Sequence, residues 1–378
     1  MSTEGKPITC KAAVAWEAGK DLVIEEIEVA APKANEVRIK IEWSALCHTD
    51  AYTLSGKDPE GNFPCILGHE GGGVVESIGE GVTNVQVGDH VIPLYTAECK
   101  ECKMCKSGKT NLCGKVRTTQ GKGVMPDGSS RFTCKGKDLL HFMGTSTFSQ
   151  YTVVADVSVV AIAKSAPLEK ACLLGCGITT GYGAATRTAK VEKGSTVCVF
   201  GVGCVGLSVI QGAKAQGASE ICAVDTNPGK KAWSEQMGAT QFVNPKELDK
   251  PVDEHLVEIM DGGFDYVFDC TGNTAVMLQG LKSCHKGWGK LIIIGVAAAG
   301  AELKVRPFLC VTGRQITGSA FGGVKGRTEL PGLVDQALRG EIDIETYVTH
   351  RKTLTSINEG FEAMKEGDCL RCVVDMSK

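Results

Sequence analysis

The sequence lacks long hydrophobic runs and has few aromatic residues. Phe, Trp and Tyr make up 6% of its 378 residues, and the longest apolar stretch, Leu291–Ala299, is interrupted by Gly295. A transmembrane helix needs about 20 apolar residues, so this stretch is too short to cross a bilayer. The first residues carry no apolar run of the signal-peptide type. We therefore expect a cytoplasmic protein that does not bind a membrane.

A strong excess of charge of one sign is also missing. The formal net charge is -3, which favours neither nucleic acid nor an anionic membrane as a partner. The chain is instead rich in cysteine, with 18 residues. Clustered cysteines in a reducing compartment indicate metal ligands or reactive thiols rather than disulfides. Length and an ordinary hydrophobic content of 43% predict about two globular domains.

Three residues from separate segments could form a zinc site of the catalytic type. Cys47 begins Cys-His-Thr-Asp, His69 lies in Gly-His-Glu-Gly-Gly-Gly, and Cys176 lies in Gly-Cys-Gly. Two thiolates and one imidazole are a ligand set that leaves a fourth zinc position open for water or substrate. Taken alone, each of these residues is more often an ordinary buried side chain, so the interpretation depends on all three.

A second set of cysteines follows within residues 95–115. Cys99, Cys102, Cys105 and Cys113 are separated mainly by polar residues, and this segment has too little apolar content for a core of its own. A bound metal would supply the missing stability, and zinc held by four thiolates fits best. An iron–sulfur cluster is the alternative, but the last spacing is seven rather than three, and Cys113 is followed by Gly114 rather than proline.

A dinucleotide-binding pattern lies in the second half of the chain. The apolar run Val197–Phe200 leads directly into Gly201, Gly203 and Gly206, and a helical pattern follows as far as Gln216. These glycines allow a tight turn, close approach of a pyrophosphate, and close packing of helix on strand. Asp225 ends the next strand pattern and would bind the adenosine ribose, which favours NAD over NADP.

The remaining patterns predict an α/β protein. Residues 1–95 are rich in short strand patterns such as Val37–Glu42, which indicates a small barrel or sandwich, and residues 114–150 resemble a surface loop with short hairpins. From residue 197 onward, apolar strands alternate with helices, which predicts a doubly wound parallel sheet. A final strand near residues 370–374 is expected to return to the first domain.

Together these residues resemble the zinc-dependent medium-chain alcohol dehydrogenases, and the similarity covers essentially the whole chain. Within that family the sequence is similar to class III. The stretches that carry this finer resemblance are residues 55–61, 110–113, 141–148 and 284–289.

The resemblance implies a GroES-like β-barrel catalytic domain and a Rossmann coenzyme domain. The catalytic domain would consist of residues 1–177 and 321–378, with a structural zinc lobe at 95–115, and the coenzyme domain of residues 178–320. It also implies a homodimer joined through strands near Ala301–Val311.

The resemblance further assigns roles to individual residues. Thr49 would relay a proton, together with His48, and Glu70 would be a second-sphere or transient zinc ligand. Two further groups of residues are implied. The coenzyme would be held by His48, Thr180, Gly201, Gly203, Val205, Gly206, Asp225, Lys230, Val296, Phe321 and Arg371. The substrate would be held by Asp58, Glu60, Arg117 and Lys286.

The implied activity is NAD-dependent oxidation of S-(hydroxymethyl)glutathione to S-formylglutathione, with two zinc ions per subunit. The implied chemistry is hydride transfer from a zinc-bound alkoxide. NADH-dependent reduction of S-nitrosoglutathione and oxidation of long-chain primary alcohols are implied as well. Two alternatives stay open: an alcohol dehydrogenase for short-chain substrates, and a zinc-stabilised NAD-binding redox sensor that has lost catalysis.

Most cysteines outside the two sets are expected in the core. Cys10 and Cys372 lie near the chain ends and are the candidates for exposed, modifiable thiols, with Arg371 beside Cys372 favouring its thiolate.

Overall fold

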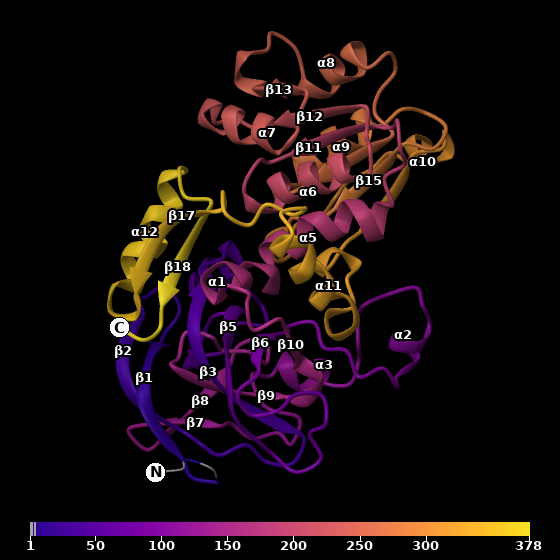
Figure 1. The fold of residues 1–378 in the computed structure, drawn as a ribbon. Helices are drawn as coiled ribbons and strands as arrows, with labels where there is room; N and C mark the ends of the chain where they lie inside the picture. Colours follow the sequence, from indigo (N-terminus) through magenta and orange to yellow (C-terminus); the bar gives the residue numbers. More distant parts are fainter. Residues whose placement is uncertain (1–2, 4) are drawn as a thin grey trace. The chain divides into compact units, whose positions relative to one another are not determined.

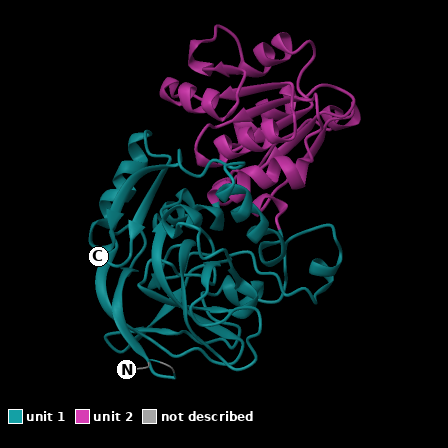
Figure 2. Ribbon diagram, viewed as in Figure 1, with its two compact units in different colours: residues 1–176, 325–378 teal, residues 177–324 magenta. Residues whose placement is uncertain are grey.

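The computed structural model describes residue 3 and residues 5–378, which form two compact units. Unit 1 consists of the chain up to Cys176 together with Lys325–Lys378, and unit 2 consists of Gly177–Val324 (Figure 2). The chain therefore leaves unit 1 after Cys176 and returns to it at Lys325.

Unit 1 contains a closed barrel and a larger sheet, and this agrees with the barrel predicted from the short strand patterns. The barrel strands, in order around it, are β1 Ile8–Ala15, β2 Val23–Val29, β7 Phe132–Cys134, β8 Lys137–His141 and β4 Cys65–Ile66. The larger sheet has the order β10 Val159–Ala161, β6 His90–Pro93, β5 Glu70–Ile78, β3 Glu36–Ala45, β18 Arg371–Asp375 and β17 Val348–Thr353, with β9 Tyr151–Ala155 also paired to β3.

Strand β3 organises the larger sheet because it pairs with β5, β9 and β18. Its pairing with β18 joins the start of the chain to its last strand, with Val373 opposite Ala45. Helix α12 packs against β17 and β18 (Figure 1) and ends at Gly367, whose φ of 87° is a left-handed conformation that glycine adopts without strain. Apart from α11 and α12, the α-helices described in unit 1 are short. The set is α1 His48–Leu54, α2 Lys103–Lys106, α3 Arg117–Gln120, α4 Leu168–Ala171, α11 Gly326–Leu338 and α12 Ile357–Glu366.

Unit 2 is a doubly wound parallel sheet, as the alternation of strands and helices predicts. Its order is β13 Gln241–Val243, β12 Glu220–Val224, β11 Thr196–Phe200, β14 Tyr266–Asp269, β15 Lys290–Ile293 and β16 Gln315–Gly318. The strand order changes direction between β11 and β14. Because the connections between parallel strands are right-handed, helices on the two sides of this point cover opposite faces of the sheet. The helices are α5 Gly177–Gly183, α6 Cys204–Ala215, α7 Lys231–Met237, α8 Val252–Ile259, α9 Thr274–Ser283 and α10 Phe308–Val311.

Three features differ from the sequence expectations. The segment 114–150 is not surface loop throughout, because Thr145–Ser149 are fully buried beneath the larger sheet and the barrel. The strands expected near residues 301–311 are not formed in the described chain, where Phe308–Val311 is the short helix α10. Helix α11 and strand β17 have no counterpart among the predicted elements. Among the described residues, every helix is too short or too polar to span a bilayer.

Candidate active site and metal centres

The structure brings Cys47, His69, Glu70 and Cys176 together inside unit 1. One potential ligand atom from each side chain lies within 4.8 Å of the others. The antiparallel pairing of β3 with β5 accounts for part of this cluster, because Ala45 pairs with Glu70 and places the residues just outside each strand side by side. Cys47 then caps the N-terminus of α1, with extended backbone angles.

Cys176 reaches the cluster from a helical segment that lies directly on β5. Helix α4 and the 3-10 turn Cys172–Gly175 pack so closely that a Cβ on Gly72 would lie 3.1 Å from the Leu168 carbonyl oxygen. A larger residue at position 72 would push this segment, and Cys176 with it, away from His69. The glycine run after His69 therefore has a packing function.

Asp50 holds two of the cluster residues in place, a role that the sequence analysis did not assign. Its side chain is fully buried and accepts hydrogen bonds from the backbone amides of Cys47, at 3.0 Å, and Gly68, at 3.1 Å. The same carboxylate lies 3.1 Å from Nδ1 of His69. The sequence did contain a signal for this role: Asp50 lies three residues after Cys47, the residue that caps α1. A side chain at that position can reach back to the backbone amide of the capping residue.

The free ring nitrogen of His69 fits a metal ligand. Nε2 is buried and has no hydrogen-bond partner among the described residues, while Nδ1 is occupied by Asp50. A hydrogen bond from Cys176, together with the charges of His69 and Arg371, outweighs burial and lowers the pKa of Cys47 well below its usual value. A ligating His usually donates its second N–H to a carboxylate in this way. The donor set therefore suits a zinc ion.

Glu70 and Arg371 form a buried ion pair beside this cluster. Nη2 of Arg371 lies 3.1 Å from one Glu70 oxygen and Nε lies 3.3 Å from the other. Both side chains are at most 4% exposed. Burial raises the pKa of Glu70 to about 8 against the opposing charge of Arg371. Arg371, which the resemblance assigned to a pyrophosphate, thus holds the Glu70 carboxylate in this structure.

Two polar residues lead from the cluster to the surface of unit 1. Thr49 is half-buried, and its Oγ1 lies 3.7 Å from Cys47 Sγ. His48 beside it is exposed. On the other side of His69, the rings of Tyr95 and Phe142 make edge contacts at 5.6 and 6.0 Å between centroids. These rings pack against the His69 ring, and the Tyr95 hydroxyl also accepts from Cys176 Sγ at 3.8 Å.

The four-cysteine segment also forms a compact set of ligand atoms, within 4.8 Å of one another. Backbone amides point at the sulfur atoms: Cys102 N donates to Cys99 Sγ at 3.3 Å, and Cys105 N donates to Cys102 Sγ at 3.4 Å. The bond from Cys105 lowers the pKa of Cys102 to about 6, whereas burial raises the pKa of Cys113 to about 12. A metal ion is needed to deprotonate the whole set.

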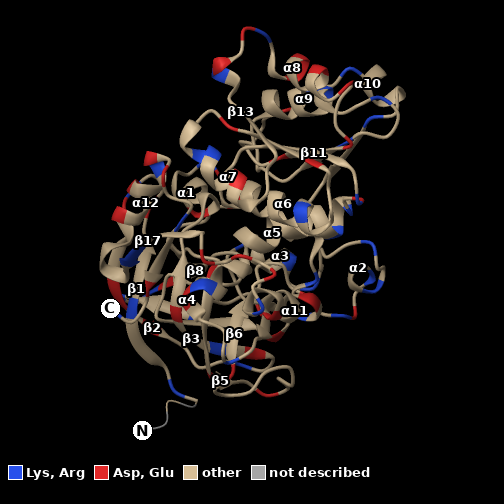
Figure 3. Ribbon diagram, turned by 45° about the horizontal axis from the view of Figure 1, so that its top comes forward, with Lys and Arg blue, Asp and Glu red and all other residues tan. Residues whose placement is uncertain are grey.

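Lysines surround this four-cysteine lobe. Helix α2 appears mostly blue in Figure 3, since it contains Lys103 and Lys106. Four thiolates around one divalent ion leave an excess of negative charge, and nearby lysines reduce its electrostatic cost. The lobe is therefore suited to a metal with anionic ligands.

In unit 2, the glycine-rich loop joins β11 to α6 at the point where the strand order reverses. A Cβ on Gly206 would lie 1.9 Å from the Gly201 carbonyl oxygen, so this position requires glycine. A Cβ on Gly203 would meet nothing within 4 Å, which leaves open space beside the helix N-terminus. Space of this kind at the first turn of a helix suits a pyrophosphate.

Asp225 follows β12 and stabilises this loop. One carboxylate oxygen accepts from Val202 N at 2.8 Å and the other from Asn227 N at 2.9 Å. Nearby, Lys230 is 8% exposed and its ammonium lies 4.9 Å from the Trp233 ring centroid. The other implied coenzyme residues of this unit vary in exposure. They are Thr180 and Phe321, which are buried, Val205, which is half-buried, and Val296, which is 72% exposed.

The implied substrate residues fall into two groups. In unit 1, Arg117 Nη2 binds both carboxylate oxygens of Glu60, at 2.6 and 2.8 Å, and both side chains are more than half exposed. Asp58 accepts from the Thr53 hydroxyl at 2.6 Å and from Glu60 N at 2.9 Å. Lys286, in unit 2, is exposed and precedes β15, so it lies at the sheet end opposite to the glycine-rich loop.

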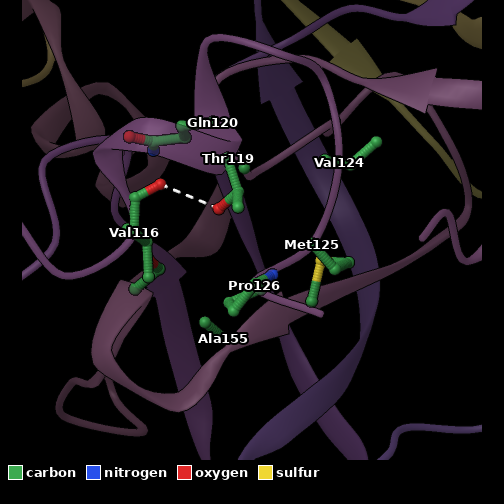
Figure 4. Close-up of a pocket in the computed structure, with 9 residues that line it drawn as sticks. Val116, Thr119, Gln120, Val124, Met125, Pro126 and Ala155 are labelled. Atoms are coloured by element: carbon green, nitrogen blue, oxygen red, sulfur yellow. Dashed lines mark hydrogen bonds between the residues drawn. The ribbon is translucent and has the colours of Figure 1, made fainter. Parts of the chain in front are cut away.

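A small cavity of about 10 Å³ lies under α3 and is lined partly by Val116, Thr119 and Met125 (Figure 4). The Thr119 hydroxyl donates to the Val116 carbonyl at 3.0 Å along one wall. A space of this size holds no more than about one water molecule. This cavity is therefore no substrate site.

The expected exposure of Cys10 and Cys372 is wrong. Cys10 is 7% exposed and Cys372 is fully buried, because each lies in a strand whose inner face is packed. Burial raises the pKa of Cys372 to about 12 against the opposing charge of Lys352. Cys310 is instead the exposed thiol among the described cysteines.

Two family models match the chain. The alcohol dehydrogenase GroES-like domain matches residues 33–164, and the zinc-binding dehydrogenase domain matches residues 204–339. The S-(hydroxymethyl)glutathione dehydrogenase of Candida maltosa is 66% identical over 378 residues, which cover 100% of this chain and 99% of that protein. The chain belongs to the zinc-dependent alcohol dehydrogenases. Members of this family are oxidoreductases, so the prediction of an enzyme is confirmed.

Other relatives place the chain in class III of these dehydrogenases. The S-(hydroxymethyl)glutathione dehydrogenase of Saccharomyces cerevisiae is 64% identical and covers 99% of this chain and 98% of its own length. The alcohol dehydrogenase class-3 of Oryza sativa subsp. japonica is 60% identical, with 100% and 99% covered.

Solved alcohol dehydrogenases share the fold. The benzyl alcohol dehydrogenase of Acinetobacter calcoaceticus superposes with a TM-score of 0.91 at 30% identity, and covers 98% of this chain and 99% of that one. An alcohol dehydrogenase zinc-binding domain protein from Burkholderia ambifaria reaches 0.92 at 32% identity, with 98% and 100% covered. The predicted fold class is thereby confirmed.

Proposed function

We propose that this dehydrogenase oxidises S-(hydroxymethyl)glutathione to S-formylglutathione with NAD as hydride acceptor. The observation that carries the proposal is the buried cluster of Cys47, His69 and Cys176, in a chain 60–66% identical over its whole length to proteins named for this reaction or as class-3 alcohol dehydrogenases. In this proposal unit 1 is the catalytic domain and unit 2 the coenzyme domain.

Cys47, His69 and Cys176 hold one zinc ion, and Cys99, Cys102, Cys105 and Cys113 hold a second. The first ion supplies a Lewis acid that lowers the pKa of an alcohol substrate, as metal ions do for bound water. The partially exposed Thr49 hydroxyl, beside Cys47, takes the alcohol proton and passes it toward His48 and solvent. Thr49 is thus the proton-relay residue of the reaction.

The charged residues behind the cluster have positioning roles. Asp50 fixes the His69 ring so that Nε2 faces the two thiolates. Arg371 holds the Glu70 carboxylate beside Cys47 and His69, where it would supply a further oxygen ligand to the ion. Because the pair is buried, the Glu70 carboxylate is kept in the site even when it does not bind the metal.

Unit 2 binds NAD at the switch point of its sheet. The loop Gly201–Gly206 receives the pyrophosphate, and Asp225 and Lys230 receive the adenosine ribose. The Asp225 carboxylate disfavours the 2′-phosphate of NADP by charge repulsion. Thr180, Val205, Val296 and Phe321 complete the coenzyme set, with His48 and Arg371 contributed by unit 1.

The substrate tail is recognised by charge. Glutathione carries two carboxylates and one ammonium, so its site needs groups of both signs. Arg117 offers a planar fork for a carboxylate, and Asp58 and Glu60 suit the ammonium. The Arg117–Glu60 pair supports this assignment, since it holds opposite charges side by side at an accessible position. Lys286 adds a further cation, and reduction of S-nitrosoglutathione at the same site stays a prediction.

The protein is further proposed to act as a cytoplasmic homodimer. Strand β16 is an edge of its sheet, and Phe308 and Val311 nearby are 71% and 77% exposed. Exposed apolar groups beside an open edge strand favour pairing with a second copy. The strands expected near 301–311 would then form only on association.

NADH formation from a glutathione–formaldehyde mixture tests the proposed reaction. The purified holoenzyme should produce NADH with the mixture at low substrate concentration and with octanol only at high concentration. A dehydrogenase for short-chain alcohols would use ethanol as readily without glutathione. A redox sensor without catalysis would bind NAD and form no NADH with any of these substrates.

A further inference from the structure

The chain returns from unit 2 to unit 1 at a point that is tied to the four-cysteine lobe. Lys325, the first residue of the returning segment, donates from Nζ to the carbonyl oxygen of Cys105 at 2.9 Å. Two residues later, Arg327 Nη1 donates to the carbonyl oxygen of Glu98 at 2.9 Å. The returning segment thus binds the backbone of the lobe at two places.

Glu98 makes the central contact of this arrangement. It precedes Cys99, and it is 4% exposed. One carboxylate oxygen accepts from the Thr328 hydroxyl at 2.6 Å, and the other accepts from the Thr328 amide at 2.8 Å. Thr328 lies in the first turn of α11, where unpaired amides and the helix dipole favour a carboxylate. Glu98 therefore fixes the N-terminus of α11 to the base of the lobe.

With zinc bound as proposed above, the lobe would owe much of its rigidity to the metal. The buried cluster there consists of Cys99, Cys105 and Cys113 together with the small apolar residues Ala97, Val116, Ala155 and Val157. So small an apolar cluster supplies little stability, and the ligand bonds supply the rest. In this proposal, metal binding by the lobe fixes the positions of Glu98 and the Cys105 carbonyl, which contact the returning segment.

The other chain crossing has a similar relationship to the first cysteine cluster. The chain leaves unit 1 directly after Cys176, which belongs to that cluster. Each crossing between the units is thus anchored at one of the two candidate zinc sites. A crossing that is held at its base restricts the orientations available to the unit beyond it.

We propose that Glu98, Lys325 and Thr328 form a hinge clamp through which the metal-loaded lobe sets coenzyme affinity. The proposal rests on the function proposed above, in which unit 2 binds NAD and the lobe holds zinc. In it, Glu98 and Thr328 are positioning residues: they touch neither coenzyme nor substrate, and they reduce the conformational freedom that coenzyme binding must otherwise remove.

Thr328→Val and Glu98→Gln test the clamp in the zinc-loaded holoenzyme. Thr328→Val removes the hydroxyl that donates to Glu98, and Glu98→Gln replaces one of the two accepting oxygens with an NH2 group. Either change leaves a buried polar atom without its partner. NADH titration by fluorescence should show a dissociation constant raised by about tenfold in both variants. The KM for NAD should rise in parallel, while the rate of hydride transfer in a single turnover at saturating coenzyme should change by less than about twofold, since neither residue touches the reacting groups.

Glu101→Gln is the matched control. Glu101 lies in the same lobe, but its side chain is exposed and contacts Lys115 at 3.7 Å, while its backbone amide, which the substitution keeps, donates to Cys99 Sγ. Its NADH affinity should equal that of the wild type. A lobe that merely stabilises the fold would show lower melting temperatures for Glu98→Gln and Thr328→Val with unchanged NADH affinity, and this result would overturn the proposal.

A double variant and an exchange measurement extend the test. If the clamp transmits the effect of the lobe, Cys105→Ala and Thr328→Val should each weaken NADH binding, and their combination should be no worse than either alone. Additive losses would contradict the proposal. Where Cys105→Ala does not fold, deuterium exchange decides: peptides across 324–330 should exchange faster in Glu98→Gln, and unchanged exchange refutes the clamp.

Measuring NADH affinity and catalysis separately distinguishes failure of this proposal from failure of the proposed function. A wild-type protein that binds zinc and NADH but does not oxidise S-(hydroxymethyl)glutathione refutes the substrate assignment, and the clamp is still measurable by NADH affinity. If catalysis is as proposed and the variants behave like the wild type, only the clamp fails.

Discussion

His69 and Asp50 are joined by a 3.1 Å contact between Nδ1 and Oδ1, both of them buried. This contact decides which ring nitrogen faces the cysteines, because it leaves Nε2 without a partner among the described residues. The same carboxylate also binds the amide of Cys47. One acidic side chain thereby orients a ligand ring and fixes the backbone of a second ligand.

Asp50→Asn should weaken the metal site while the fold is retained. Both carboxylate oxygens of Asp50 face donors. In asparagine only one of the two positions is an oxygen, so the NH2 group faces a donor and at least one of these contacts is lost. Removing such a supporting contact typically costs about 10–100-fold in metal affinity. Competition with a chelator, followed by metal analysis, measures this change. Asp58→Asn is the control, and equal zinc loss in both variants would refute the role of Asp50.

The two cysteine sets should respond differently to mutation. Cys47→Ala removes a ligand of the candidate active site, so turnover should be lost while the melting temperature stays within a few degrees of the wild type. Cys105→Ala should lower the melting temperature markedly because the lobe has little apolar core. Wild-type protein should contain about two zinc ions per chain by elemental analysis. Identical melting curves for both variants and the wild type would contradict the structural assignment.

Coenzyme preference should depend on Asp225. Because this carboxylate also binds the amides of Val202 and Asn227, replacement by glycine would disturb the loop as well as the charge. Asp225→Asn removes the charge and keeps an acceptor oxygen. The ratio of kcat/KM for NADP to that for NAD should rise by about tenfold. An unchanged ratio would show that Asp225 supports the loop only.

Arg117→Ala should affect the glutathione adduct selectively. Because Arg117 is 56% exposed on its side chain and already paired with Glu60, the loss should be modest, about three- to tenfold in kcat/KM. Oxidation of octanol should be unchanged, since that substrate has no carboxylate. Lys115→Ala, which removes a nearby exposed cation, is the control. Equal losses on both substrates would mean that Arg117 supports the fold or the coenzyme site.

His141 should contribute to instability in acid. Burial, assisted by the charge of Arg131, lowers its pKa to about 3, and its neutral Nε2 accepts from the Arg131 amide. The unfolded chain binds a proton on this ring below about pH 6.5, and the folded chain does not. Its contribution to stability is therefore present above pH 6.5 and is lost progressively as the pH falls toward 3.

His141→Gln tests this contribution, because glutamine keeps an acceptor without titrating in this range. Between pH 7 and 5 the variant should lose about 2 kcal/mol less free energy of unfolding than the wild type. Denaturant unfolding at several pH values measures it. Stability profiles that run parallel across this range would contradict the assignment.

Local patterns in the sequence predicted the parts of the site that local geometry determines. Gly201 and Gly203 lie between β11 and α6, and Gly206 lies in the first turn of α6, as expected, because a strand, a glycine turn and a helix are specified within a few residues. The four cysteines of the lobe lie within 15 residues of one another, so their spacing alone indicated a common site.

Contacts between distant segments could not be predicted in this way. Glu98 and Thr328 are 230 residues apart, and no short pattern relates them. Cys372 is buried because β18 pairs with β3 and β17, and the residues next to Cys372 in sequence do not predict these pairings. Helix α11 escaped prediction because Pro331 lies inside it, beyond the first turn where proline is tolerated, so the local sequence argues against a helix there.

The pairing of β18 with β3 has a consequence for biosynthesis. Val373 lies opposite Ala45, so the larger sheet is incomplete until almost the entire polypeptide has left the ribosome. Unit 2, which is continuous from Gly177 to Val324, can fold earlier, since domains generally fold as units during synthesis. Until β18 arrives, Glu70 lacks the arginine that pairs with it. A nascent chain stalled before residue 371 should therefore expose the β3 edge to chaperones.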